Sequence, residues 1–129
     1  MEKNQYNKEG LPHGYWEYYN KNGKLAFKGN YINGIVNGYW EEYFYNGSLE
    51  FKGNFTNDKK EGYWEYYYSD GELYGKGNYL NGNREGYWEF YFSNGELQNK
   101  GNYINGNREG YWEFYYTYGK LFKTEYFVI

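Results

Sequence analysis

Aromatic and polar residues alternate along most of this chain, and the alternation recurs with a fixed period. The tryptophans stand at positions 16, 40, 64, 88 and 112, so neighbouring copies are always 24 residues apart. Alternation with period two predicts half-buried strands, and a constant spacing of this size predicts a repeat protein whose units bury their apolar sides against one another. The units start at Gly14, Gly38, Gly62, Gly86 and Gly110. Residues 14–129 are therefore the expected repeat domain, and residues 1–13 are expected to form an N-terminal half-repeat or cap.

Two turn signals divide each unit into two strands. One is an Asn-Gly or Asp-Gly pair such as Asn94-Gly95, and the other is represented by Asn81-Gly82. Both favour two-residue type I′ turns, because the two central residues of that turn need positive φ. With such turns, the residues predicted to lie directly opposite each other are Trp88 and Gly101, Glu89 and Lys100, Phe90 and Asn99, Phe92 and Leu97, and, around the second turn, Phe51 and Trp64.

The pairings around both turns place the same residues on the same side of the sheet. This predicts an all-β fold, an elongated, twisted, single-layer antiparallel sheet of about ten strands built from 24-residue β-hairpin repeats. One side is expected to carry Trp16, Tyr18, Leu25, Phe27, Tyr31 and their equivalents. The other side is expected to carry Tyr15, Glu17, Tyr19, Lys28, Asn30 and theirs. On this second side each repeated Glu faces a Lys, except that Glu113 faces Thr124.

The two ends of the chain depart from the repeat. Tyr6 is one place out of register with Tyr31, so the N-terminal segment is expected either to contain a bulge or to follow another course. Pro12 suits an edge or a bulge, since it lacks a backbone donor. Residues 125–129 replace the usual Gly-Asn-Tyr with a more apolar stretch. This last strand either folds over the sheet as a cap or forms an exposed edge.

Composition limits the classes of function. The chain has 22 Tyr, 9 Phe and 5 Trp in 129 residues, as strands favour, and it has no Cys, which removes thiol and disulfide chemistry. No apolar segment resembles a secretory signal or approaches the roughly 18 residues of a spanning helix, so we expect a cytoplasmic protein without a transmembrane segment. A net charge of −3 and a pI of 5.3 argue against a nucleic-acid partner, which would need a basic groove.

The sequence offers no convergent set of catalytic residues. The single histidine, His13, is expected at the surface or at an edge, without a convergent partner. The repeated glutamates could be compared with the paired acids of a glycosidase, but copies two strands apart would be separated by about 9.6 Å. A facing Lys also keeps each of the first four glutamates ionised. We therefore predict a protein that is not an enzyme and that needs no metal or cofactor.

Binding is the alternative, and both sides of the sheet offer candidates. The tryptophan-bearing side is either a core or, because a single layer leaves it uncovered, a surface for a second copy, another protein or a flat ligand. The tyrosines of the other side can stack and hydrogen-bond with little loss of entropy. Arg84 and Arg108, opposite Tyr79 and Tyr103, form either cation–π pairs or a basic spot for phosphate. The candidate binding residues are Tyr15, Tyr19, Tyr39, Trp40, Tyr43, Tyr63, Trp64, Tyr67, Arg84, Tyr87, Trp88, Tyr91 and Arg108.

The unit pattern G-Y-W-E-x-Y-x-x-N-G-x-L-x-x-K-G-N-Y-x-N-G-x-x-x-G resembles the MORN (membrane occupation and recognition nexus) repeat. More narrowly, it resembles the bacterial variant found in antitoxin-like proteins. The resemblance covers residues 14–129 and implies an elongated strip of hairpins. It also implies an interaction scaffold, which in some members binds lipid or dimerises.

Three functions follow from these observations. We predict a non-enzymatic repeat scaffold that binds a protein partner through its aromatic surface, and a homodimer is compatible with this function. The first alternative is a binding protein for a nucleotide-like or phosphorylated small molecule. The second alternative is a toxin-neutralising protein, which is suggested by the antitoxin-like resemblance alone.

Overall fold

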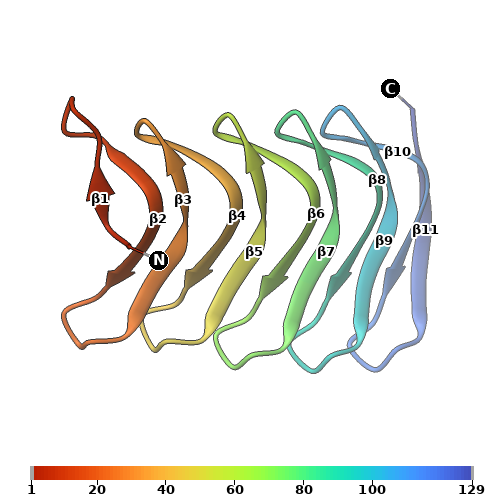
Figure 1. Cartoon of the computed structure of the whole chain (residues 1–129). Helices are drawn as coiled ribbons and strands as arrows, with labels where there is room; N and C mark the ends of the chain where they lie inside the picture. Colours follow the sequence, from red (N-terminus) through yellow and green to blue (C-terminus); the bar gives the residue numbers. More distant parts are fainter. Residues whose placement is uncertain (1, 129) are drawn as a thin grey trace.

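The computed structural model describes residues 2–128 as one open sheet of eleven antiparallel strands. Each strand pairs with the next one in sequence, so the hairpins lie side by side in a row (Figure 1). The predicted all-β, single-layer architecture is confirmed, and no helix long and apolar enough to cross a membrane occurs in the described part of the chain. The strands are β1 (Gln5–Tyr6), β2 (Pro12–Tyr19), β3 (Leu25–Ile32), β4 (Ile35–Tyr43), β5 (Leu49–Thr56), β6 (Lys59–Tyr67), β7 (Leu73–Leu80), β8 (Asn83–Tyr91), β9 (Leu97–Ile104), β10 (Asn107–Tyr115) and β11 (Leu121–Phe127).

The strands bend toward the side that carries the tryptophans, which we call the tryptophan side. Lys60 Nζ donates a hydrogen bond of 2.7 Å to Tyr66 Oη, although both residues belong to β6 and are six positions apart. A straight strand would separate their Cα atoms by about 20 Å. The bowed strands in Figure 1 bring such side chains together, and the curvature encloses rings that a flat single layer would leave in water.

The second turn of each unit is the predicted type I′ turn. Asn81 and Gly82 both have positive φ, at 52° and 86°, and Leu80 pairs with Asn83 directly across the turn. The turn also joins neighbouring units, because Gly82 N donates to Lys60 O at 3.0 Å. These turns therefore form one continuous edge of the strip.

The first turn differs from the prediction. Gly95 N donates to Phe92 O at 3.0 Å and Phe92 N donates to Glu96 O at 2.8 Å, so three residues form the loop, and Gly95 has the positive φ of 91°. This is the geometry of a type I turn followed by a bulge residue. As a result Tyr91, not Phe92, lies opposite Leu97.

Because this loop is longer than predicted, the leucine that follows it lies on the other side of the sheet from the one predicted. Leu25 pairs with Tyr19, and residues directly opposite each other share a face, so Leu25 lies on the side of the tyrosines and not with Trp16 as predicted. Beyond the loop the predicted register is confirmed, with Trp88 opposite Gly101, Glu89 opposite Lys100 and Phe90 opposite Asn99.

The register around the second turn shifts by two residues. Phe51 pairs with Tyr66 and not with the predicted Trp64, because β6 has two extra residues between Glu61 and Glu65. A shift by an even number preserves the side on which each residue lies. Phe51 and Trp64 therefore lie on the predicted side of the sheet, although the predicted pairing between them was wrong.

Both ends of the chain continue the sheet. The N-terminal loop is one residue longer than its equivalents, but Tyr6 in β1 still packs edge-on against Trp16, with ring centroids 5.2 Å apart. β11 runs alongside β10 and does not fold over the sheet. Of the two predicted alternatives for this strand, the exposed edge is the one observed, and Ile129 lies outside the described residues.

Candidate binding surfaces

The tryptophans form the core of the strip. Trp64 and Trp88 have no exposed surface and Trp40 is 5% exposed, so these three candidates are enclosed by their neighbours. The ring of Trp88 packs between Tyr79 and Tyr103, and its Nε1 donates to Asn78 O at 2.9 Å. In this conformation such rings cannot reach a partner without the sheet opening.

The rings of Trp40, Trp64, Trp88 and Trp112 each cover a glycine, but in the strand before it. A Cβ placed on Gly77 would lie 2.2 Å from the ring of Trp88, and one on Gly53 would lie equally close to Trp64. Trp88 stands opposite Gly101 in the next strand, as predicted, yet its ring leans toward Gly77. The missing side chain is what allows the ring to lie against the backbone.

Basic side chains cover the outer edge of this core. Arg84 lies opposite Tyr79 in the predicted register, but its guanidinium carbon lies over other rings, 5.1 Å from the centroid of Trp88 and 5.4 Å from that of Tyr103. Arg108 repeats the arrangement and lies 4.9 Å from the centroid of Trp112. The predicted cation–π contacts thus form with different aromatic partners.

Lys60 occupies the position of Arg84 in the preceding unit, and the sequence did not identify it as a candidate residue. Its Nζ lies 5.1 Å from the centroid of Trp64 and 5.2 Å from that of Tyr79. Burial, and then the nearby charge of Arg84, lower the pKa of Lys60. Its position in the unit, equivalent to that of Arg84, is the signal that could have identified it.

A cavity of about 200 Å³ lies between the two arginines on the tryptophan side. Arg84, Arg108, Gln98 and Asn99 line it together with aromatic rings, and the ion pairs of residues 2–128 involve neither arginine. Asn99 Oδ1 is buried without a hydrogen-bond partner. The two guanidinium groups make this cavity suited to an anion, and the free Asn99 Oδ1 could accept a hydrogen bond from a donor group on the same ligand.

The opposite side, which we call the tyrosine side, consists of three rows that run across the strands. Cross-strand register and repeat position define each row. The Tyr/Asn row is Tyr15, Asn30, Tyr39, Asn54, Tyr63, Asn78, Tyr87, Asn102 and Tyr111. The ion row is Glu17, Lys28, Glu41, Lys52, Glu65, Lys76, Glu89, Lys100 and Glu113. The Tyr/Leu row is Tyr19, Leu25, Tyr43, Leu49, Tyr67, Leu73, Tyr91, Leu97, Tyr115 and Leu121.

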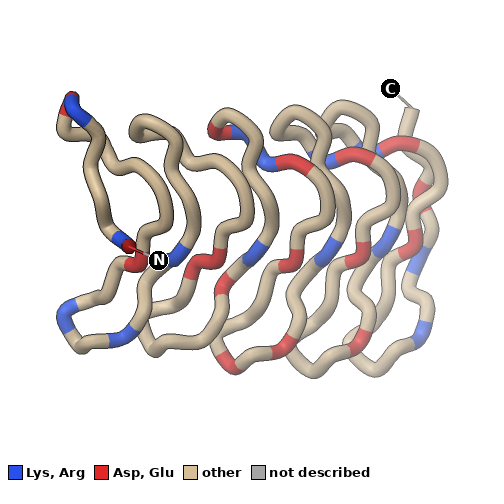
Figure 2. The backbone as a smooth tube through the Cα atoms, viewed as in Figure 1, with Lys and Arg blue, Asp and Glu red and all other residues tan. Residues whose placement is uncertain are grey.

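The ion row alternates in sign along the strip, as the red and blue positions across the middle of Figure 2 show. Lys52 lies in register between Glu41 and Glu65, and its Nζ forms an ion pair of 3.4 Å with Glu65 of the following unit. The predicted partner was the glutamate of the same hairpin. Glu113 lies opposite Thr124, as predicted, and pairs with Lys100 at 3.5 Å.

Tyrosines on both sides hold Glu17, Glu41, Glu65 and Glu89, and Tyr115 holds Glu113 from one side. Tyr87 and Tyr91 donate to the two carboxylate oxygens of Glu89 at 2.8 and 2.5 Å. Burial opposes ionisation of Glu89, but these hydrogen bonds and the charge of Lys76 outweigh it and keep its pKa below the ordinary value. A carboxylate held in this way cannot serve as the proton donor that glycoside hydrolysis needs.

Apart from Tyr111, whose hydroxyl has no hydrogen bond among the described residues, the tyrosine rings of these rows are fixed at their hydroxyl ends. The rings are open to solvent along their sides. Tyr63 and Tyr87 are each 49% exposed and Tyr111 is 55% exposed. Burial, and then the hydrogen bond to Glu17, raise the pKa of Tyr15 to about 12, so the hydroxyl remains a donor at neutral pH. The surface is therefore aromatic, ordered and partly accessible.

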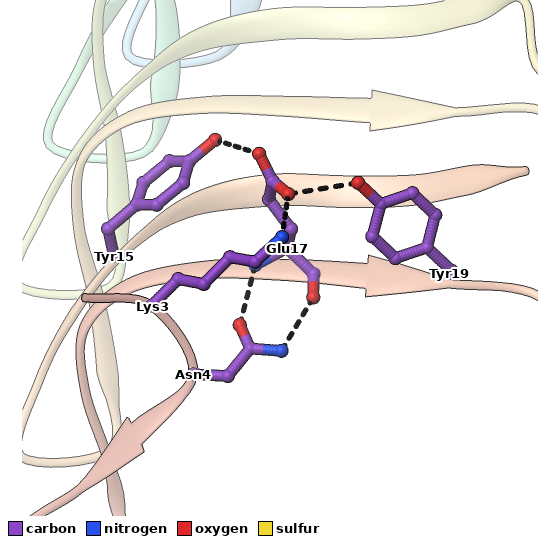
Figure 3. Close-up of polar contacts among 5 residues, drawn as sticks. All are labelled: Lys3, Asn4, Tyr15, Glu17 and Tyr19. Carbon is purple, nitrogen blue, oxygen red and sulfur yellow. Dashed lines mark hydrogen bonds and ion pairs between the residues drawn. The ribbon is translucent and has the colours of Figure 1, made fainter. Parts of the chain in front are cut away.

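The N-terminal segment completes this pattern at the first unit (Figure 3). The side chain of Asn4 accepts from Glu17 N at 2.8 Å and donates to Glu17 O at 3.0 Å, in place of a neighbouring strand. Lys3 Nζ pairs with Glu17 at 2.8 Å, and this bond, with those from Tyr15 and Tyr19, lowers the pKa of Glu17 to about 2.

His13 has a structural role at the edge of the strip. Its Nδ1 accepts a hydrogen bond of 3.0 Å from Asn33 N in the neighbouring turn. Glu61 and Glu85 bond to the equivalent turns at the same distance. Within residues 2–128 no group of three or more side chains is arranged to hold a metal ion.

Comparison with known proteins agrees with this repeat. The family described as the MORN repeat variant matches four tandem segments, residues 12–33, 36–57, 60–81 and 84–105. Each segment corresponds to one hairpin of the row in Figure 1. No curated protein matches the chain. Because the four matches cover more than half of its 129 residues, the chain belongs to the MORN repeat variant family.

Proposed function

We propose that this protein is a non-enzymatic repeat scaffold of the cytoplasm that binds a protein partner through its tyrosine side. The observation that supports this function most is the Tyr/Asn row, in which Tyr39, Tyr63, Tyr87 and Tyr111 are 45–55% exposed at equivalent positions. The tryptophan candidates belong to the core, so the tyrosine candidates of the Tyr/Asn row, Tyr15, Tyr39, Tyr63 and Tyr87, are the ones assigned to the partner.

The tyrosine side chains of the Tyr/Asn row are suited to binding a protein partner. A tyrosine offers a large contact area with only two side-chain torsions to restrict, and Tyr63 has its hydroxyl already bonded to Glu65 at 2.8 Å. A ring that is ordered before binding loses little further entropy when a partner covers it. Interfaces are enriched in such residues for this reason.

A capture experiment with matched variants tests the proposal. The wild-type chain is immobilised and exposed to native lysate, beside the double variant Tyr63→Ala/Tyr87→Ala and the control Tyr45→Ala. Tyr45 is 57% exposed but lies in a loop outside the three rows. We expect one defined protein to bind the wild type and the control and to be lost from the double variant. Equal capture by all three would reject the tyrosine side as the binding surface.

The cavity between Arg84 and Arg108 supports a second candidate function, the binding of a phosphorylated small molecule. Two guanidinium groups that already lie against aromatic rings can bind phosphate oxygens in bidentate fashion. We expect ATP or an inositol polyphosphate to raise the melting temperature of the wild type but not of Arg84→Ala/Arg108→Ala. Lys120→Ala, in an exposed loop, is the control and should respond like the wild type. No shift with any of these anions would remove this candidate.

The resemblance to antitoxin-like proteins provides the third candidate, a toxin-neutralising role. Its test is genetic: the gene beside this one should encode a protein that inhibits growth when expressed alone. Co-expression of the present chain should relieve that inhibition. A neighbouring gene product without toxicity would leave the scaffold function as the better explanation.

A further inference from the structure

The Tyr/Asn row contains slots that recur along the strip. One cavity of about 350 Å³ lies between Tyr39 and Tyr63, with Asn54 and the backbone of Gly53 at its base. An equivalent cavity of about 240 Å³ lies between Tyr87 and Tyr111, above Asn102. Each slot therefore has an aromatic ring on two sides and an asparagine between them, and an ion pair of the ion row, Lys52–Glu65 or Lys100–Glu113, also lines it.

The asparagines give each slot hydrogen-bonding capacity. The backbone carbonyls of Asn54 and Asn102 accept from the indole nitrogens of Trp64 and Trp112 on the tryptophan side. Their side chains, and that of Asn78, are exposed on the tyrosine side. A bound chain with unpaired backbone carbonyls would find a side-chain donor at every second strand.

The spacing of the slots selects among peptide conformations. Tyrosines of the row are two strands apart, about 9.6 Å. A polyproline II helix repeats every three residues, or about 9.3 Å, which leaves a mismatch of about 1 Å over three slots. A β-strand presents side chains of one face every 6.6–6.8 Å, and an α-helix presents its seventh residue after about 10.5 Å, so both lose register within the row.

The charge of the neighbouring row favours an uncharged partner. Every lysine of the ion row forms an ion pair of 3.4–3.7 Å with a glutamate, and Lys3 pairs with the remaining glutamate, Glu17. With Lys3 included, the row has no excess of either sign with which to attract a strongly acidic or basic segment. Polyproline II segments leave their backbone carbonyls solvated and dock on aromatic grooves.

We propose that the Tyr/Asn row binds a proline-rich segment in the polyproline II conformation, laid across the strands with a proline in each slot at every third residue. The inference rests on the proposed protein-binding function and names the chemistry of the partner. Tyrosine rings pack against the prolines, and the asparagine side chains donate to the carbonyls between them.

The test uses the full chain and a fluorescently labelled peptide of repeating Pro-Pro-Ala. About twelve residues of it would extend roughly 37 Å, close to the length of the Tyr/Asn row from β2 to β10, which is about 38 Å. Fluorescence anisotropy should show saturable binding that strengthens with peptide length up to this size and then levels off. The all-D peptide, whose helix has the opposite hand, should bind at least about tenfold more weakly.

Variants distinguish the Tyr/Asn row from the rest of the tyrosine side. Tyr63→Ala/Tyr87→Ala should weaken binding by about tenfold or more, whereas Tyr67→Ala/Tyr91→Ala, which alters the Tyr/Leu row, should change it less than about twofold. Asn54→Leu/Asn78→Leu changes only exposed side chains and should also weaken binding, even if the tyrosine variants unfold.

Three results would overturn the inference: no saturable binding of the L peptide, equal binding of its mirror image, or equal loss in the two tyrosine double variants. The proposed function would survive them if Tyr63→Ala/Tyr87→Ala still failed to capture the protein that the wild type captures from lysate. In that case the partner would bind the tyrosine side through a different conformation.

Discussion

Single residues stabilise the strip mainly through the contact between a tryptophan ring and a glycine in the preceding strand. A Cβ on Gly53 would lie 2.2 Å from the fully buried ring of Trp64, so Gly53→Ala must displace that ring. We expect it to lower the free energy of unfolding by about 1–3 kcal/mol. Trp64→Ala should lower it by about 3–5 kcal/mol, because it leaves a cavity. Urea unfolding measures both changes.

The control for this prediction is Asn54→Ala, the next residue along the same strand. Its side chain is exposed on the tyrosine side, so its effect should be near zero. If Trp64→Ala left stability unchanged and instead abolished capture of a partner, Trp64 would be an interface residue and the assignment of the tryptophan side as core would be wrong.

Apart from Leu25 and its equivalents, the sequence predicted which residues share a side but not which neighbour each one contacts. Lys52 lies in register with both Glu41 and Glu65, and Trp88 stands between Gly77 and Gly101. The residue types alone do not show which of its two neighbours Lys52 or Trp88 contacts. Strand curvature and side-chain orientation decide between them, and neither can be read from an alternating pattern.

At the scale of elements, the two turns show why similar sequence signals give different geometries. Asn81-Gly82 adopts positive φ at both residues, whereas Asn94-Gly95 supplies the end of a type I turn and the bulge residue after it. Asn94 Oδ1 accepts from Glu96 N at 2.9 Å, and its amide donates to Thr117 O of the next unit at 2.7 Å. Contacts between units thus stabilise a turn that the dipeptide alone does not specify.

The last strand, β11, leads to a prediction about self-association. Its outer edge has no neighbouring strand among residues 2–128, and Phe122 and Tyr126 on it are 54% and 72% exposed. Such an edge can pair with a second copy, which is the simplest route to a homodimer. We expect Tyr126→Lys to reduce concentration-dependent association in sedimentation experiments. Tyr118→Lys, in a loop and 69% exposed, is the control, and an equal effect of both would argue against pairing through this edge.

At the scale of the whole molecule, the repeat makes the architecture predictable because every unit makes the same contacts with the next. The ion pairs, the indole hydrogen bonds and the turn contacts all join a unit to its neighbour. The side-chain contacts that accompany the curvature, such as that between Lys60 and Tyr66, were not predicted, since they join residues of one strand that bends. That curvature makes the tryptophan side a core and leaves recognition to the tyrosine side.

The ion row and its tyrosines also predict how stability of the whole strip depends on pH. The glutamates have pKa values lowered from 4.5, to about 2 for Glu17, so their contribution is present above pH 4.5 and is lost as the pH falls through the lowered values. Tyr15 and Tyr115 have pKa values raised from 10.0 to about 12, so their contribution is present below pH 10 and is lost as the pH rises toward 12. We therefore expect the melting temperature to decline on both sides of a plateau between these limits.

The variant Glu65→Gln tests this dependence in acid. It should reduce the decline of the melting temperature at low pH, because its amide does not titrate. A decline unchanged in this variant would show that the ion row does not control stability in acid.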